Sequence, residues 1–174
     1  LAVFVNDSWN NIDKLSSVPA IISVVFFAFQ LYLDFAAYSE IAKGIGKLLG
    51  FEVMTNFKRP YLSRSFKEFW KRWHISLSSW FMDYVYIPIG GNRKGEARRI
   101  INLMIVFFLS GLWHGASLTF VLWGILNGFF VIVFDRIFKA GKGINSFIVF
   151  ISWSLSLILF RAPDVNSVAE FTKH

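Results

Sequence analysis

Three long apolar runs, separated by more polar and basic segments, dominate the sequence and predict membrane-spanning helices. The first run covers residues 18–38, which matches the ~20 apolar residues that one helical crossing of a bilayer requires. The other two cover residues 100–134 and 144–160. Because a chain inside lipid must satisfy its own backbone hydrogen bonds, we expect these runs to be helices and the protein to be all-α and polytopic.

The run 100–134 is too long for one crossing and slightly short for two. About 35 helical residues extend over ~52 Å, against ~30 Å of hydrocarbon. We therefore expect two short spans that meet near His114, or a broken helix that places His114 in a cavity. Two glycine pairs have the spacing that lets helix backbones approach closely: Gly111 with Gly115, and Gly124 with Gly128.

Residues 65–84 have a different pattern, which predicts one amphipathic helix in the membrane interface. Apolar residues recur at helical spacing and form one stripe: Phe66, Phe69, Trp70, Trp73, Leu77, Trp80, Phe81 and Tyr84. Charged residues lie on the other side: Arg64, Lys67, Glu68, Lys71 and Arg72. A helix with these two faces lies in the interface rather than across it. His74 falls on the border between the faces, as a site residue or as a titratable interfacial side chain without chemistry.

The composition agrees with a membrane protein, since 55% of the residues are hydrophobic against ~45–50% in soluble domains. The net charge is +7, and 12 of the 18 Lys and Arg residues lie between residues 43 and 99. Such a charge in a soluble protein would suggest nucleic acid. Here the basic residues flank apolar runs, so we expect the lipid bilayer, and no nucleic acid, as the partner.

His114 is the strongest candidate for chemistry, because it is the one ionisable side chain in the run 100–134. An ionisable group at membrane depth is costly and indicates function, although a histidine held in a helix bundle for packing alone gives the same pattern. A histidine in a partly hydrated cavity suits a general base that acts on an alcohol. Ser110 lies four residues earlier, so a Ser–His nucleophilic pair is the alternative. We rank it lower because no orienting acid is in view.

Other kinds of site find little support in the sequence. The absence of cysteine excludes a disulfide framework, a thiolate nucleophile and a Cys-ligated metal. His74 and His114 have no Asp, Glu or His partner at helical ligand spacing, so we expect no metal and no tightly bound cofactor. We interpret Asp34, near the end of the first run, as the structural partner of an arginine.

The sequence resembles the membrane-bound O-acyltransferase (MBOAT) superfamily, within it the alginate O-acetylase type. Five segments carry the resemblance in order: Leu-Tyr-Leu-Asp-Phe-Ala-Ala-Tyr-Ser-Glu at 31–40, Asn-Phe-Lys-Arg-Pro-Tyr at 56–61, Glu-Phe-Trp-Lys-Arg-Trp-His-Ile-Ser-Leu-Ser-Ser-Trp at 68–80, Asp-Tyr-Val-Tyr-Ile-Pro-Ile-Gly-Gly-Asn-Arg at 83–93 and Ser-Gly-Leu-Trp-His-Gly-Ala at 110–116. Met82 departs from the pattern, because a basic residue is common there.

The resemblance implies an integral membrane enzyme that transfers an acyl group to a hydroxyl, built as a ring of helices around a thin central layer. It implies that His114 is the catalytic residue and His74 a second functional one. The implied donor is acetyl-CoA or another acyl thioester. The implied acceptor is an exported or cell-envelope polysaccharide such as alginate, or a downstream acetyl-transfer protein of the envelope. The implied location is the bacterial inner membrane, with several crossings.

Two other functions stay open at this point. D-alanyl transfer to teichoic acid would keep the superfamily and change the substrate, but the segment Ile-Pro-Ile-Gly-Gly-Asn-Arg at 87–93 favours the acetylase. A polytopic transporter subunit would place His114 in a proton or solute path and should carry further ionisable residues along it. The chain begins without Met and ends abruptly at His174, so we expect a segment of a longer protein.

Overall fold

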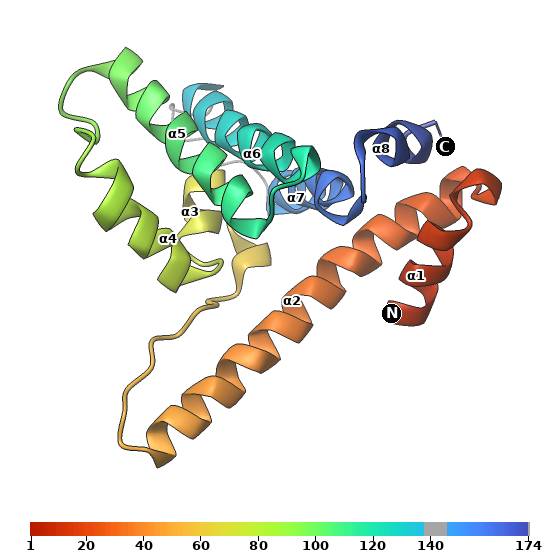
Figure 1. The fold of residues 1–174 in the computed structure, drawn as a ribbon, viewed down its shortest axis with the longest axis horizontal. Coiled ribbons are helices and arrows are strands. Elements are labelled where there is room, and N and C mark those ends of the chain that lie inside the picture. Colours follow the sequence, from red (N-terminus) through yellow and green to blue (C-terminus); the bar gives the residue numbers. More distant parts are fainter. Residues whose placement is uncertain (138–145, 174) are drawn as a thin grey trace.

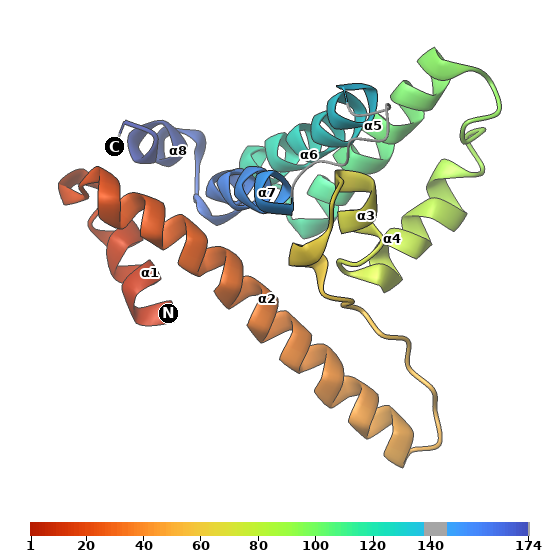
Figure 2. The same ribbon diagram turned by 180° about the vertical axis from the view of Figure 1, so that it is seen from behind.

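The computed structural model describes residues 1–137 and 146–173, and within them all regular structure is helical (Figures 1 and 2). The α-helices are α1 (Ala2–Asn10), α2 (Ser17–Leu48), α3 (Phe66–Trp70), α4 (Ile75–Phe81), α5 (Glu96–His114), α6 (Leu118–Ile137), α7 (Ser146–Arg161) and α8 (Val165–Phe171). Short 3-10 turns occupy Ile12–Lys14 and Pro60–Leu62, and Met82–Tyr86 is a π-helical turn. The predicted all-α class is therefore confirmed for the described residues.

The first apolar run lies in α2, which has 32 residues and is ~48 Å long. In the described part of the chain, α2 is the one helix both long and apolar enough to cross a membrane, and two shorter apolar helices follow at Leu118–Phe134 and Ser146–Arg161. The helix extends beyond the apolar run to Leu48, and that the crossing itself ends at residue 38 stays a prediction. Glycines within this extension cost only ~1 kcal/mol each, too little to end a helix.

Helices α5 and α6 form a closely packed hairpin whose turn follows His114. Figure 1 shows the two helices side by side. A Cβ added to Gly111 would clash with the carbonyl of Phe120, and one added to Gly124 would clash with that of Phe107. The two glycines therefore face the neighbouring backbone, as their spacing predicts. That α5 and α6 each cross the bilayer stays a prediction.

The prediction of one helix over residues 65–84 is wrong. The chain forms α3 and α4, separated at residues 71–74, and then the π-helical turn. The break has a tertiary cause, because the extended segment before α3 takes over backbone hydrogen bonds of the link. The Lys58 N–H donates to the Arg72 carbonyl at 2.9 Å, and the Ile75 N–H donates to the Asn56 carbonyl at 3.0 Å.

An aromatic core joins α3 to α6 and α7. The ring centroids of Phe69 and Trp153 are 4.5 Å apart, and those of Trp73 and Trp153 are 4.9 Å apart. Phe69 and Trp153 are fully buried, whereas Lys67 and Lys71 on the opposite side of the same segment are exposed. The predicted two-faced pattern thus holds for α3. The third apolar run corresponds to α7, with residues 144 and 145 outside the described part.

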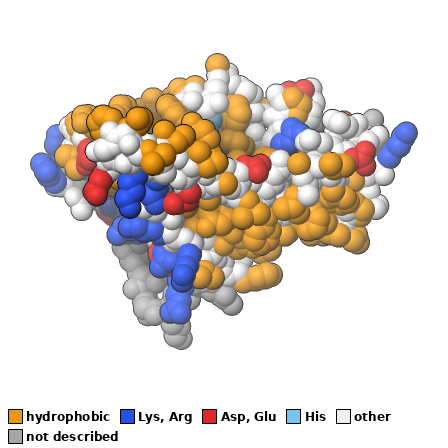
Figure 3. Space-filling view, turned by 90° about the horizontal axis from the view of Figure 1, so that it is seen from below, with side chains coloured by type: hydrophobic (Ala, Val, Ile, Leu, Met, Phe, Trp, Pro, Cys, Tyr) orange, Lys and Arg blue, Asp and Glu red, His pale blue; other side chains and the backbone are white. Residues whose placement is uncertain are grey.

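Much of the molecular surface is apolar. Figure 3 shows hydrophobic side chains over a large part of one face, with Lys and Arg side chains gathered towards one end. Helix α2 contributes several exposed apolar side chains: Ile21, Leu33, Ile41, Ile45 and Leu48. Exposed apolar areas of this extent are typical of surfaces that contact lipid or further protein.

Candidate active site

His114 is the last residue of α5, and the turn after it is built from small and polar residues. The Gly115 N–H donates to the Leu112 carbonyl at 3.1 Å and closes the last turn. A Cβ at position 115 would clash with the ring of Phe120, so only glycine fits there. The Ser117 hydroxyl then accepts a hydrogen bond from the Thr119 N–H at 3.3 Å and caps the start of α6. The helix break therefore holds His114 at a fixed place in the hairpin.

The imidazole of His114 is half-buried among aromatic rings. Its ring centroid lies 5.0 Å from that of Trp113, 5.1 Å from that of Trp123 and 5.0 Å from that of Phe160. The Trp123 and Phe160 rings stand nearly perpendicular to the imidazole. Among residues 1–137 and 146–173, no group hydrogen-bonds to either ring nitrogen. Ring packing therefore orients the imidazole and leaves both nitrogens able to meet a substrate.

His74 occupies the link between α3 and α4, in a backbone conformation that is uncommon for residues other than glycine. Its backbone is left-handed, with φ 44° and ψ 57°. Such a conformation costs a non-glycine residue about 1–3 kcal/mol and is concentrated at functional sites. The buried imidazole lies edge-on between Phe35, at 4.6 Å between ring centroids, and Trp113, at 5.8 Å.

The structure brings His74 and His114 together on one cavity of about 240 Å³. The wall is otherwise apolar and mostly aromatic, formed by Leu31, Phe35, Trp73, Trp113, Trp123, Trp153 and Phe160. Helix α2, the α3–α4 link and helices α5, α6 and α7 all contribute. Because this volume is below the ~300–1,000 Å³ of sites for drug-sized ligands, it suits part of a ligand rather than a whole drug-sized molecule.

Two residues considered from the sequence lie outside the histidine cavity. Ser110 is on the wall of a second cavity and makes no hydrogen bond to His114. Asp34 is exposed on α2, and no arginine of the described segments forms the expected ion pair with it. Because Ser110 makes no hydrogen bond to His114, the Ser–His pair is not formed in this structure.

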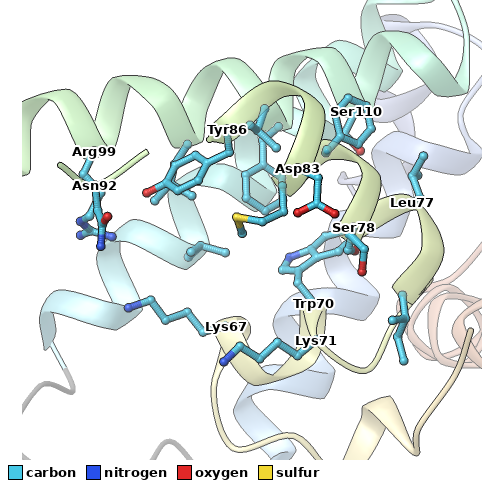
Figure 4. Close-up of a pocket in the computed structure, with 18 residues that line it drawn as sticks. Lys67, Trp70, Lys71, Leu77, Ser78, Asp83, Tyr86, Asn92, Arg99 and Ser110 are labelled. Atoms are coloured by element: carbon cyan, nitrogen blue, oxygen red, sulfur yellow. The ribbon is translucent and has the colours of Figure 1, made fainter. Parts of the chain in front are cut away.

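The second cavity, of about 640 Å³, lies between α5 and the segment from α3 to the π-helical turn (Figure 4). Lys67, Lys71 and Arg99 supply cationic groups on its wall, and Asp83 and Tyr86 come from the π-helical turn. Single π-helical turns occur frequently at functional sites. The sequence does not predict this cavity, because its lining comes from separate segments that only the tertiary structure brings together.

Comparison with known proteins places these features in a family. The family model of the membrane-bound O-acyltransferases (MBOAT) matches residues 4–147. A probable alginate O-acetylase, AlgI, of Pseudomonas syringae pv. tomato is 47% identical over 134 residues, 75% of this chain and 25% of the relative. The peptidoglycan O-acetyltransferase of Helicobacter pylori is 35% identical over 180 residues, 99% of this chain and 34% of the relative.

A third relative is named for a different activity. The teichoic acid D-alanyltransferase of Streptococcus thermophilus is 33% identical over 140 residues, which is 74% of this chain and 33% of the relative. The chain therefore spans between a quarter and about a third of the length of the three relatives. In all three, the matched part corresponds to most of the chain described here.

Proposed function

The chain belongs to the membrane-bound O-acyltransferase family, and from this premise we propose that it forms the catalytic part of an O-acetyltransferase acting on an exported or cell-envelope polysaccharide. Relatives named as alginate O-acetylases are 41–48% identical to it. Those named as teichoic acid D-alanyltransferases reach 31–33%. This difference favours acetyl transfer over D-alanyl transfer.

The shared cavity of His74 and His114 is the observation that carries the proposal. His114 acts as the general base. A ring nitrogen accepts the proton of the sugar hydroxyl while the hydroxyl oxygen attacks the thioester carbonyl carbon. The C–S bond then breaks, and the departing thiolate takes the proton back from the imidazolium. General-base catalysis of this kind contributes about 10²–10⁴-fold in rate.

His74 orients one of the two reacting groups. Its imidazole lies on the same cavity and is fixed by its packing against Phe35 and Trp113. A hydrogen bond from this ring to the thioester carbonyl or to the acceptor hydroxyl would hold the group in line for attack. Positioning of reacting atoms is worth a large part of an enzymatic rate enhancement.

The second cavity supplies an approach for an anionic acyl thioester such as acetyl-CoA. Lys67 and Lys71 attract phosphates, whereas Arg99 on the same wall is held by Glu96 through two hydrogen bonds of 2.7 Å. Ser110, on its wall, lies one helical turn before His114 on α5. The donor is a substrate that arrives and leaves, so no tightly bound cofactor is part of the proposal.

The proposed setting is the bacterial inner membrane, crossed several times by the full-length protein. The exposed apolar side chains of α2 support lipid contact, and the two short apolar helices α6 and α7 support the thin central layer of a helical ring. The acceptor, a polysaccharide or an acetyl-transfer protein of the envelope, would approach from the side opposite the donor.

The test compares ester-linked groups on envelope polysaccharides, by mass spectrometry, in cells with the full-length protein and in cells that lack it. We expect acetyl esters to disappear with the protein while D-alanyl esters are unchanged. Loss of D-alanyl esters instead would assign the chain to the other transfer reaction. An unchanged content of both esters would contradict acyl transfer to an envelope polymer.

A further inference from the structure

Helix α4 has an unusual start, because its capping group comes from a distant segment. His74 is the residue at the cap position, and its own side chain makes no capping hydrogen bond. The side chain of Asn56 does so instead. Its Oδ1 accepts a hydrogen bond from the Ser76 N–H at 3.0 Å and another from the Ser76 hydroxyl at 2.6 Å.

The backbone of the same segment holds the other side of the link. The Asn56 carbonyl accepts the Ile75 N–H, and the Lys58 N–H donates to the Arg72 carbonyl. Four hydrogen bonds therefore join this segment to residues on both sides of His74. Asn56 accepts three of them, from Ile75 and Ser76, and Lys58 donates the fourth to Arg72. The intervening Phe57 packs on Phe35, at 5.0 Å between ring centroids, which itself contacts the His74 ring.

We propose that Asn56 is a positioning residue for His74. Because the Asn56 side chain caps α4, the left-handed backbone of His74 is fixed and the imidazole does not have to cap the helix itself. The ring is then held on the cavity that it shares with His114. The consequence for catalysis rests on the proposed function, whereas the consequence for the placement of His74 does not.

Two measurements on the full-length protein separate these consequences. The first is the rate at which diethyl pyrocarbonate modifies His74 and His114, followed by peptide mass spectrometry, which reports ring placement without any acetyl transfer. The second is the kcat and KM for acetyl transfer. The variants are Asn56→Ala, Asn56→Asp and Ser76→Ala, with Asn11→Ala as a matched control. Asn11 is an exposed asparagine that bonds only within the region of α1.

Asn56→Ala should raise the modification rate of His74 several-fold, leave KM nearly unchanged and lower kcat by about 10- to 100-fold, as a displaced catalytic group does. Asn56→Asp should restore wild-type behaviour, because a carboxylate accepts both Ser76 hydrogen bonds and suits a helix N-terminus. Asn11→Ala should match the wild type in both measurements. Unchanged labelling of His74 in Asn56→Ala would overturn the proposal, whatever happens to activity.

If Asn56→Ala does not accumulate, Ser76→Ala decides the matter, because it removes only the hydroxyl hydrogen bond. It should give a smaller rise in His74 labelling, and no rise would overturn the proposal. If the labelling changes as expected but the wild-type protein transfers no acetyl group, the proposed function fails and the placement of His74 by Asn56 stands.

Discussion

His74 and His114 line one cavity of about 240 Å³, although 40 residues separate them in the sequence. Trp113 contacts both imidazoles, with ring-centroid distances of 5.8 Å to His74 and 5.0 Å to His114. The indole ring of Trp113 therefore connects the packing of the α3–α4 link with that of the end of α5. A change in the position of either histidine alters the packing of the other.

Replacing His114 by Ala should abolish acetyl transfer and leave the amount of protein in the membrane unchanged. The general base is worth about 10²–10⁴-fold in rate, and the half-buried ring leaves space that substrate or water can occupy. Initial rates in membrane vesicles, scaled by immunoblot, measure the loss. A variant that keeps more than about a tenth of the wild-type rate would remove His114 from the reaction.

Replacing Ser110 by Ala should leave acetyl transfer close to the wild-type rate. Ser110 lies on the wall of the second cavity, and no hydrogen bond joins it to His114 in the described residues. The same vesicle assay makes the comparison. A loss as deep as that of His114→Ala, together with an acetylated Ser110 peptide found by mass spectrometry, would instead establish the Ser–His nucleophilic pair.

The sequence allows part of this arrangement to be predicted, and α2 and the α5–α6 hairpin illustrate which part. The length of the run 100–134 against the bilayer thickness requires an interruption, and the one ionisable residue marks its place at His114. The first run likewise predicts α2, which extends beyond the run to Leu48 because glycines there weaken a helix without ending it.

The α3–α4 link and the second cavity show why the rest could not be predicted. Helical periodicity continues without interruption across residues 71–74. The hydrogen bonds that divide the helix come from a distant segment: the Lys58 N–H donates to the Arg72 carbonyl after α3, and Asn56 accepts hydrogen bonds from Ser76 at the start of α4. The cavity likewise combines Lys67 with Arg99, from segments with no common motif. Local patterns do not contain such tertiary contacts.

Replacing Gly111 or Gly124 by Ala should destabilise the protein by about 1–3 kcal/mol, because each added methyl meets a backbone carbonyl of the facing helix. Gly44 provides the matched control. It lies within α2 with open space around it, so alanine there should be neutral or stabilise the helix by up to ~1 kcal/mol. The fraction of full-length protein that stays soluble in detergent after heating measures the difference. Equal stability of Gly111→Ala and Gly44→Ala would contradict the close approach of α5 and α6.

Replacing Lys67 and Lys71 together by Gln should raise the KM for acetyl-CoA by about 2- to 30-fold, since exposed charges contribute ~0.2–1 kcal/mol each. The kcat should change little, because neither amine lies on the histidine cavity. Added salt should raise the wild-type KM and have less effect on the variant, because salt screens exposed charges. Replacing Lys14 and Lys47 by Gln lowers the net charge by the same amount at a distance from the second cavity. This control variant should keep the wild-type KM. The same KM in both double variants would place the entry of the donor elsewhere, because charge near the cavity would then have no more effect than charge at a distance.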